Sequence, residues 1–303
     1  MEIIRDTNID FMRLKKLSFS LSGFLILCGF ISLFLVFTGR ANLGVDFAGG
    51  TSVQVKFEKP VEVDTLRKAL SGAGFKDVNI QDFAGSNVVL IKVGQKSGKG
   101  EMVAGKISET IKKALGDVKF EVQSATEIGP AVGEKLRRDA LIAVLISTIG
   151  IILYIAWRFE FKFGVAAAIA TFHDVLTVLA VFTLLGKEIN LLIVTALLTL
   201  AGYSLTDTVV VFDRIRENLR ARKGKTFSEV TNRSINEVLS RTIITSLTTF
   251  IAVASLLVLG GEVIRDFALA LAIGIIVGTY SSVFVASPLV VVWRGEKLVH
   301  VKK

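Results

Sequence analysis

Six long apolar stretches constrain the fold of this chain more than any other feature of its sequence. They cover approximately residues 17–38, 140–157, 164–185, 191–212, 243–259 and 267–293, and charged residues bound each of them. A helix needs about 20 predominantly apolar residues to cross the hydrocarbon core of a bilayer. A helix buried in a water-soluble protein is rarely apolar on most faces over that length. The sequence therefore predicts an α-helical polytopic membrane protein with six transmembrane helices.

The composition supports this class and argues against others. Apolar residues make up 51% of the chain and charged residues 21%, which is too few charges for a surface that lies wholly in water. The single cysteine, Cys28, excludes an internal disulfide, and two histidines argue against a histidine-rich metal centre. No nucleophile–base set is recognisable, so we expect no catalytic centre, cofactor or bound metal.

The distribution of Lys and Arg predicts the orientation in the membrane. The segments on the side of both termini hold 18 of these residues, and the short opposite loops hold only Lys187 and Arg265. Because cytoplasmic loops carry the excess of positive charge, both termini are predicted to be cytoplasmic. The net charge of +9 then reflects topology, and nucleic acid is not an expected partner.

Residues 39–138, between the first two spans, are predicted to form one extracytoplasmic α+β domain. The expected order is a strand at 51–57, a helix at 61–73, strands at 78–83 and 88–93, a helix at 101–115 and a strand at 118–126. This is the order of a ferredoxin-like fold. The remaining parts are a cytoplasmic segment at 1–16, the first span at 17–38, a five-helix bundle at 139–293 with a cytoplasmic loop at 213–241, and a cytoplasmic tail at 294–303.

A glycine-rich run leads into the first strand of this domain. Gly44, Asp46, Gly49 and Gly50 are typical of a turn in which the glycines adopt positive φ and the carboxylate accepts hydrogen bonds from local amides. We interpret the run as structural.

Ionisable residues within the predicted spans call for an explanation, since each costs about 2.5–3.5 kcal/mol at the centre of a membrane helix. Asp207 lies in the fourth span, and Arg241 opens the fifth, so antiparallel packing would bring the two to similar depth. His173 and Asp174 lie in the third span. Polar residues at helical spacing share the faces of these positions: Thr171 and Thr177 with Asp174, Thr195, Thr199 and Tyr203 with Asp207, and Thr245, Thr248 and Thr249 with Arg241. Thr206, directly before Asp207, is a further intramembrane polar residue.

Two interpretations of these groups remain open. Asp207 and Arg241 can form a proton relay, in which a carboxylate and a guanidinium that separate and rejoin bind and release a proton. Alternatively the groups form static hydrogen bonds and salt bridges that hold helices together. Arg241 can also be an interfacial residue whose charge reaches the headgroups, and His173 with Asp174 can be a satisfied pair between helices.

Three other patterns concern the ends and faces of helices. Thr226 and Glu229 form a capping-box sequence at the start of an amphipathic helix that we expect to lie along the inner membrane face. Gly274 and Gly278 form a GxxxG pattern, which marks close helix contact within the chain or with a partner. Asp213 is predicted to join a salt-bridge network at the membrane rim.

Several of these motifs together resemble the SecD/SecF family of protein-export membrane proteins, and its SecF members in particular, within the resistance-nodulation-division superfamily. The resemblance covers nearly the whole chain and rests on residues 44–51, 128–133, 172–174, 202–218 and 241–246. Thr206 departs from the family pattern, which has Asn directly before the aspartate.

The resemblance implies a multi-pass protein of the cell's inner membrane that acts in protein export. It implies a heteromeric complex with SecD, association with the SecYEG channel and commonly with YajC, and unfolded preproteins as clients. It also implies use of the proton-motive force late in translocation, with Asp207 and Arg241 at the proton-linked positions and protons as the coupling ion.

Two other functions remain as alternatives. An autonomous proton-coupled pump for small molecules or lipids would need large porter domains, whereas residues 39–138 offer little room for a drug-sized pocket of about 300–1,000 Å³. A membrane scaffold without transport activity would tolerate the loss of Asp207.

Overall fold

The structure is a computed structural model that describes residues 7–75, 78–83, 87–94, 103–116, 118–221 and 224–295. It divides into two compact units. The membrane unit comprises Met1–Asn42, Ala143–Glu188 and Leu192–Lys303, and the sheet unit comprises Leu43–Ile142 with Ile189–Leu191. The ends of the predicted terminal segments, residues 1–6 and 296–303, lie outside the described residues.

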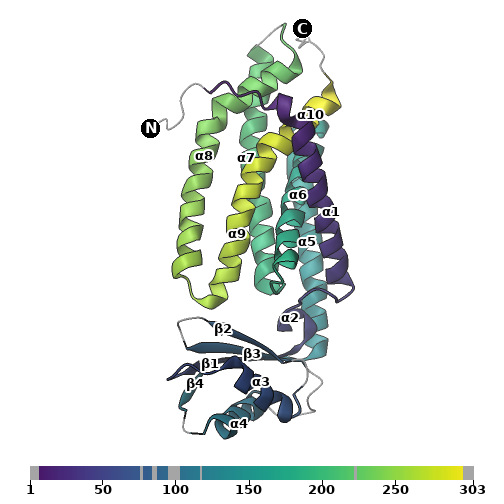
Figure 1. The fold of residues 1–303 in the computed structure, drawn as a ribbon. Coiled ribbons are helices and arrows are strands. Elements are labelled where there is room, and N and C mark those ends of the chain that lie inside the picture. Colours follow the sequence, from purple (N-terminus) through teal and green to yellow (C-terminus); the bar gives the residue numbers. More distant parts are fainter. Residues whose placement is uncertain are drawn as a thin grey trace. The chain divides into compact units, whose positions relative to one another are not determined.

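Six helices of the described chain are long and apolar enough to cross a membrane, which confirms the predicted number of spans. They are labelled in Figure 1. A short 3-10 helix, Met12–Leu14, leads into α1 (Lys15–Phe37); then follow α5 (Pro130–Arg158), α6 (Phe161–Leu184), α7 (Leu191–Ala221), α8 (Phe227–Leu259), α9 (Glu262–Ser281), a π-helix (Ser282–Ala286) and α10 (Ser287–Arg294).

The helices of the membrane unit differ in how deeply they are buried. Helix α6 is buried along most of its length and packs against α1, α9 and the π-helix. Helices α1, α5 and α8 instead expose many apolar side chains, such as Phe24, Leu145 and Ile251. Because apolar side chains favour lipid over water, these helices form the surface that meets lipid or another chain.

The segment predicted as a cytoplasmic loop, 213–241, is mostly helical. Helix α7 continues to Ala221, and α8 begins at Phe227, so both extend beyond the length that a bilayer requires. The predicted capping box is confirmed, since Glu229 N donates to Thr226 Oγ1 at 3.3 Å and Thr226 N donates to Glu229 Oε2 at 2.9 Å. The predicted amphipathic helix is therefore not separate, because it is the first part of the continuous helix α8.

The last span contains an irregularity that the apolar pattern does not predict. The π-helix ends at Ala286, two residues before Pro288, whose ring cannot pack against the preceding turn of an α-helix and which has no N–H. Ser287 Oγ donates to the carbonyl oxygen of Ser282 at 2.8 Å, so a side chain satisfies a backbone acceptor within the π-helix.

The sheet unit has the predicted ferredoxin-like order. Helix α2 (Val45–Ala48) precedes β1 (Gly50–Phe57), α3 (Val63–Gly72), β2 (Asn79–Phe83), β3 (Val88–Val93), α4 (Val103–Leu115) and β4 (Phe120–Ile128). The strands form one antiparallel sheet in the order β2-β3-β1-β4. Alternate residues of β1, such as Val53 and Val55, pack with Leu66 of α3 and Ile107 of α4 in a single core.

Candidate functional site

Asp207 is buried in the membrane unit and is held by hydroxyl groups. Its side chain on α7 is 5% exposed. Ser246 Oγ of α8 donates to Asp207 Oδ2 at 3.2 Å, and Thr279 Oγ1 of α9 lies 2.7 Å from Ser246 Oγ. A chain of two hydroxyls therefore connects three helices to one carboxylate. Such a group can exchange a proton without breaking an ion pair.

Arg241 does not form an ion pair with Asp207 in this conformation. In the described part of the chain, Ser246 is the side chain that hydrogen-bonds to Asp207, whereas Arg241 acts on it electrostatically. Arg241 is exposed on α8 and lines a cavity of about 450 Å³. The other lining residues are Val210, Asp213, Arg214, Glu217, Glu237 and Val238.

The side of α8 that meets Asp207 is not the one that carries Arg241. Thr242 and Ser246 are buried, while Thr245 and Thr248 are exposed. The Thr248 hydroxyl bonds to carbonyl oxygens of its own helix. The sequence does not identify Ser246 as a site residue, because the charge of Arg241 marks the neighbouring face of α8 as the functional one.

The predicted polar stripe on α7 is only partly buried. Thr195 and Thr199 of the stripe are exposed, as is Thr206 beside it, and the hydroxyls of Thr199 and Thr206 bond to carbonyl oxygens one turn earlier. Tyr203 lies next in the stripe, and its hydroxyl is buried with no hydrogen-bond partner among the described residues. The stripe thus runs from an exposed end to the buried carboxylate of Asp207.

A second buried carboxylate lies at the centre of the membrane unit. Asp174 Oδ2 accepts hydrogen bonds from Ser204 of α7 and from Ser281 of α9, the latter at 2.7 Å. Asp174 Oδ1 lies 2.8 Å from Nδ1 of His173. Both side chains are fully buried. Thr177, predicted on the same face, bonds through its hydroxyl to the carbonyl oxygen of His173, and the buried hydroxyl of Thr171 has no partner among the described residues.

The GxxxG glycines lie against α7. A Cβ on Gly278 would approach Ser204 Cβ to 3.1 Å, and one on Gly274 would approach Leu200 Cδ1 to 2.5 Å. The structure therefore places this close contact within the chain. It also brings α9 near enough for Ser281 to reach Asp174.

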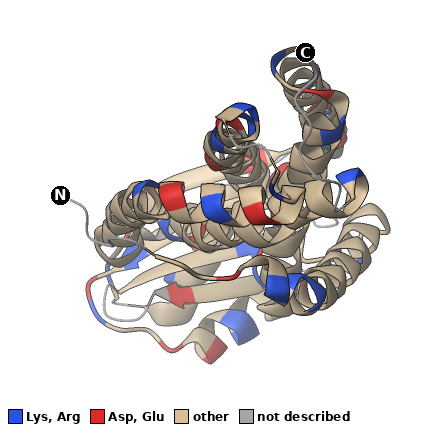
Figure 2. Ribbon diagram, turned by 90° about the horizontal axis from the view of Figure 1, so that it is seen from above, with Lys and Arg blue, Asp and Glu red and all other residues tan. Residues whose placement is uncertain are grey.

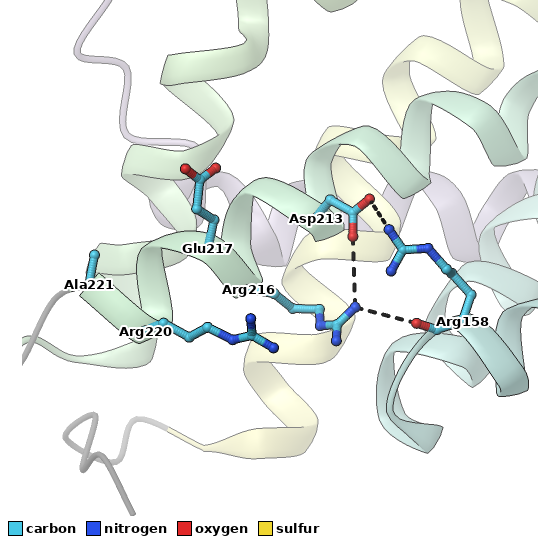
Figure 3. A pocket seen from close by; sticks show the side chains of 6 residues that line it. All are labelled: Arg158, Asp213, Arg216, Glu217, Arg220 and Ala221. Atoms are coloured by element: carbon cyan, nitrogen blue, oxygen red, sulfur yellow. Dashed lines mark hydrogen bonds and ion pairs between the residues drawn. The ribbon is translucent and has the colours of Figure 1, made fainter.

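The rim of the membrane unit carries a network of charges next to this site. Asp213 Oδ2 accepts from Arg158 at 2.8 Å, and Asp213 Oδ1 lies 3.7 Å from Arg216. Figure 3 shows both guanidinium groups turned toward Asp213. These residues and Arg220 line a cavity of about 620 Å³. Figure 2 shows the mixture of positive and negative residues on the ends of the helices seen from above. Asp213 thus belongs to a surface network.

Glu237 remains ionised in this network. Burial raises the pKa of its carboxyl, but hydrogen bonds from Asn218, Arg233 and Arg214 outweigh that effect and lower the pKa to about 2. Since Glu237 is charged throughout the physiological pH range, it fixes α7 to α8 and does not carry protons.

The glycine-rich entry to the sheet unit is structural, with one correction. Gly49 and Gly50 adopt φ values of 71° and 141°, as predicted, but Gly44 has φ of −67°. Asp46 does not bond to local amides: its Oδ2 accepts at 3.0 Å from the backbone N–H of Leu191, 145 residues away and first in α7. The carboxylate thereby satisfies one of the free donors at that helix N-terminus.

Gly50→Ala is expected to destabilise the sheet unit by about 1–3 kcal/mol. A Cβ at this position would lie 2.5 Å from the carbonyl oxygen of Val93, and the φ of 141° strains any other residue. Urea-dependent proteolysis of the full chain measures the effect. Gly105→Ala is the control, because a Cβ there meets nothing within 4 Å; equal stability of the two variants would contradict the assignment.

In the described part of the chain, no three His, Cys, Asp or Glu side chains are grouped as ligands for a metal ion.

Comparison with known proteins identifies the family of the chain. Residues 107–296 match the family model "Protein export membrane protein SecD/SecF, C-terminal", and residues 34–61 match the "SecD/SecF GG Motif". The protein translocase subunit SecF of Thermodesulfovibrio yellowstonii is 51% identical over 99% of this chain and 99% of that protein. The SecF subunit of Calditerrivibrio nitroreducens is 47% identical over 96% of each chain.

A solved structure has the same fold. The crystal structure of SecDF from Thermus thermophilus, a translocon-associated membrane protein, matches with a TM-score of 0.83 and 40% sequence identity. The match covers 95% of this chain and 39% of the SecDF chain.

Proposed function

Because the chain belongs to the SecD/SecF family of protein-export membrane proteins, we propose that it couples proton movement to protein export through Asp207. It is a multi-pass membrane protein of the Sec export machinery. The observation that carries the proposal is the buried carboxylate of Asp207, which has a hydroxyl partner and, among the described residues, no counter-ion in contact.

A carboxylate in this position responds to helix rearrangement. When ionised, Asp207 only accepts hydrogen bonds, as it does from Ser246; when protonated, it also has one O–H donor that needs an acceptor. A charge that crosses a membrane potential of about 100 mV yields about 2.3 kcal/mol, which is enough to shift a two-state equilibrium by more than tenfold. Proton binding thus favours one arrangement of α7, α8 and α9 and proton release favours the other.

The cavity beside Arg241 supplies the route to one side of the membrane. Val210, one helical turn after Asp207, lines it together with Arg241. An approach of Arg241 to Asp207 would favour the ionised form and release the proton. The excess of Lys and Arg at this end of the helices supports a cytoplasmic location for the cavity and for both termini, with the sheet unit extracytoplasmic.

SecD is the proposed partner of the exposed faces of α7 and α8. The similar SecDF protein is a single chain, of which this chain matches 39%. On α7, Gly202 is exposed and a Cβ there meets nothing within 4 Å, so another helix can approach closely. We extend the partnership to the SecYEG channel and YajC, with unfolded preproteins as clients; the description of SecDF as translocon-associated supports the channel.

Ser246→Ala tests the proposed site without removing a charge. Hydrogen bonds to charged groups contribute about 1.5–3 kcal/mol, so we expect the stimulation of preprotein export by a proton gradient to fall about tenfold. Import into inverted membrane vesicles, with ATP supplied and with or without a protonophore, measures this stimulation. Thr245→Val is the matched control, because it removes an exposed hydroxyl of the same helix. Equal losses in the two variants would contradict the role of Ser246.

A further inference from the structure

The His173–Asp174 pair has one feature that a static helix-packing contact does not require. Nε2 of His173 is fully buried and has no hydrogen-bond partner among the described residues. Its other ring nitrogen, Nδ1, faces Asp174 Oδ1 at 2.8 Å. A buried polar atom without a partner destabilises the folded state, so the pair is incomplete in this conformation.

The charges on the pair define what Nε2 can bind. With Asp174 ionised, Nδ1 carries the proton and donates to the carboxylate, and Nε2 is a bare lone pair. The pair then has a net charge of −1 inside the membrane unit. A proton on Nε2 produces an imidazolium beside the carboxylate, and the net charge becomes zero. The proton thereby removes the cost of a buried charge that has no compensating partner.

In the described part of the chain, the side chains that hydrogen-bond to Asp174 from α7 and α9 are neutral. Ser204 of α7 and Ser281 of α9 donate to Asp174. From α9, the Tyr280 ring lies 6.3 Å from the His173 ring, and its hydroxyl turns to Ser18 and Ser22 of α1. Asp207 follows Ser204 by three residues on α7.

Helices α7 and α9 both link the His173–Asp174 pair to Asp207. On α7, Ser204 bonds to Asp174, and Asp207 follows three residues later. On α9, Ser281 bonds to Asp174, and Thr279 reaches Asp207 through Ser246. The π-helix begins directly after Ser281, and π-helical turns allow a local change of register. A shift of α7 against α9 therefore alters both carboxylates together.

We propose that His173 and Asp174 form a second proton-binding site, which accepts a proton at Nε2 of His173. A hydronium ion transfers the proton to the Nε2 lone pair and leaves as water, so no other bond is broken and no redox partner is needed. Its role in export rests on the proposed function, but its occupancy by a proton is measurable separately.

Nitrogen-15 NMR of histidine tests the site directly. The chain has two histidines, so His300→Gln leaves His173 as the single histidine in a chain without an affinity tag. The full chain is labelled with ¹⁵N-histidine and titrated in lipid bilayers between about pH 8 and pH 5. We expect a neutral ring protonated at Nδ1 at high pH and an imidazolium at low pH. A neutral spectrum that does not change across this range would overturn the proposal.

Two variants test whether the His173–Asp174 site is coupled to Asp207. Asp207→Asn tests whether the two sites are connected, and at a given pH we expect its histidine spectrum to differ from that of the parent chain. Thr171→Val removes a buried hydroxyl of the same helix outside the network and is expected to leave the spectrum unchanged; identical spectra in both variants would overturn the connection between the two sites. If His173 titrates but Asp207→Asn still supports gradient-driven export, the proposed function fails and the second site stands. If export is lost in Asp207→Asn and His173 does not titrate, only the second site fails.

Discussion

Asp207→Asn is expected to abolish the stimulation of preprotein export by a proton gradient, a loss of at least about tenfold, while ATP-driven export continues. The substitution preserves the shape of the side chain and its ability to accept from Ser246. It removes the group that exchanges a proton. The energy that one proton gains by crossing a membrane potential, about 2.3 kcal/mol per 100 mV, then no longer changes the arrangement of α7. Vesicles that contain the complete translocation complex, assayed with and without a protonophore, give the measurement.

Asp139→Asn is the control for this experiment. Asp139 lies exposed on α5, where its Oδ1 is 3.9 Å from Nε of Arg138, and it does not line the cavity beside Arg241. Surface ion pairs contribute about 0–1 kcal/mol, so this variant should retain gradient-driven export. Full stimulation in the Asp207→Asn variant would favour a scaffold and exclude the proposed mechanism.

Gly29→Ala is expected to loosen the contact between α1 and α6 and to lower the melting temperature of the chain by several degrees. A Cβ at Gly29 would lie 2.6 Å from Cβ of Leu176 and 2.8 Å from its carbonyl oxygen. Because backbone atoms of α6 cannot move aside as a side-chain end can, the helices must separate. Overpacking of this kind costs about 1–3 kcal/mol, or about 2–4 °C per kcal/mol in chains of this size.

Gly23→Ala separates this clash from the general effect of replacing glycine in a helix. Gly23 lies on α1 as well, but a Cβ there meets nothing within 4 Å. Helix propensity favours alanine by about 1 kcal/mol at both positions, so Gly23→Ala should be neutral or slightly stabilising. Thermal unfolding in detergent or nanodiscs compares the two variants, and a similar decrease for both would show that α1 does not pack as described.

The spans and the sheet were predictable because each depends on a local pattern. Six apolar stretches predict six membrane helices, which the structure contains. The alternation along residues 51–57 predicts β1, which begins at Gly50. The π-helix was not predicted, although Pro288 within the last apolar stretch was the available signal. Hydropathy alone does not report where a hydrogen-bond ladder is interrupted.

The site was less predictable because helical spacing does not determine how a helix is rotated about its axis. The sequence identifies Asp207 because it is a carboxylate within an apolar span, and in the structure its side chain is buried. Its partners Ser246 and Thr279 were not identified, because serine and threonine recur on every face of these helices. The contact between Asp46 and Leu191 joins residues 145 apart in the chain, a distance that no local pattern reveals.

The central claim is that the carboxyl group of Asp207 changes its ionisation state as the proton gradient acts on the protein. Infrared difference spectroscopy of the assembled complex in vesicles measures this directly, with the C=O stretch assigned by its absence in the Asp207→Asn variant. The account predicts that this band grows and declines as a gradient is imposed and removed. A carboxyl group that keeps one ionisation state with and without the gradient would contradict it.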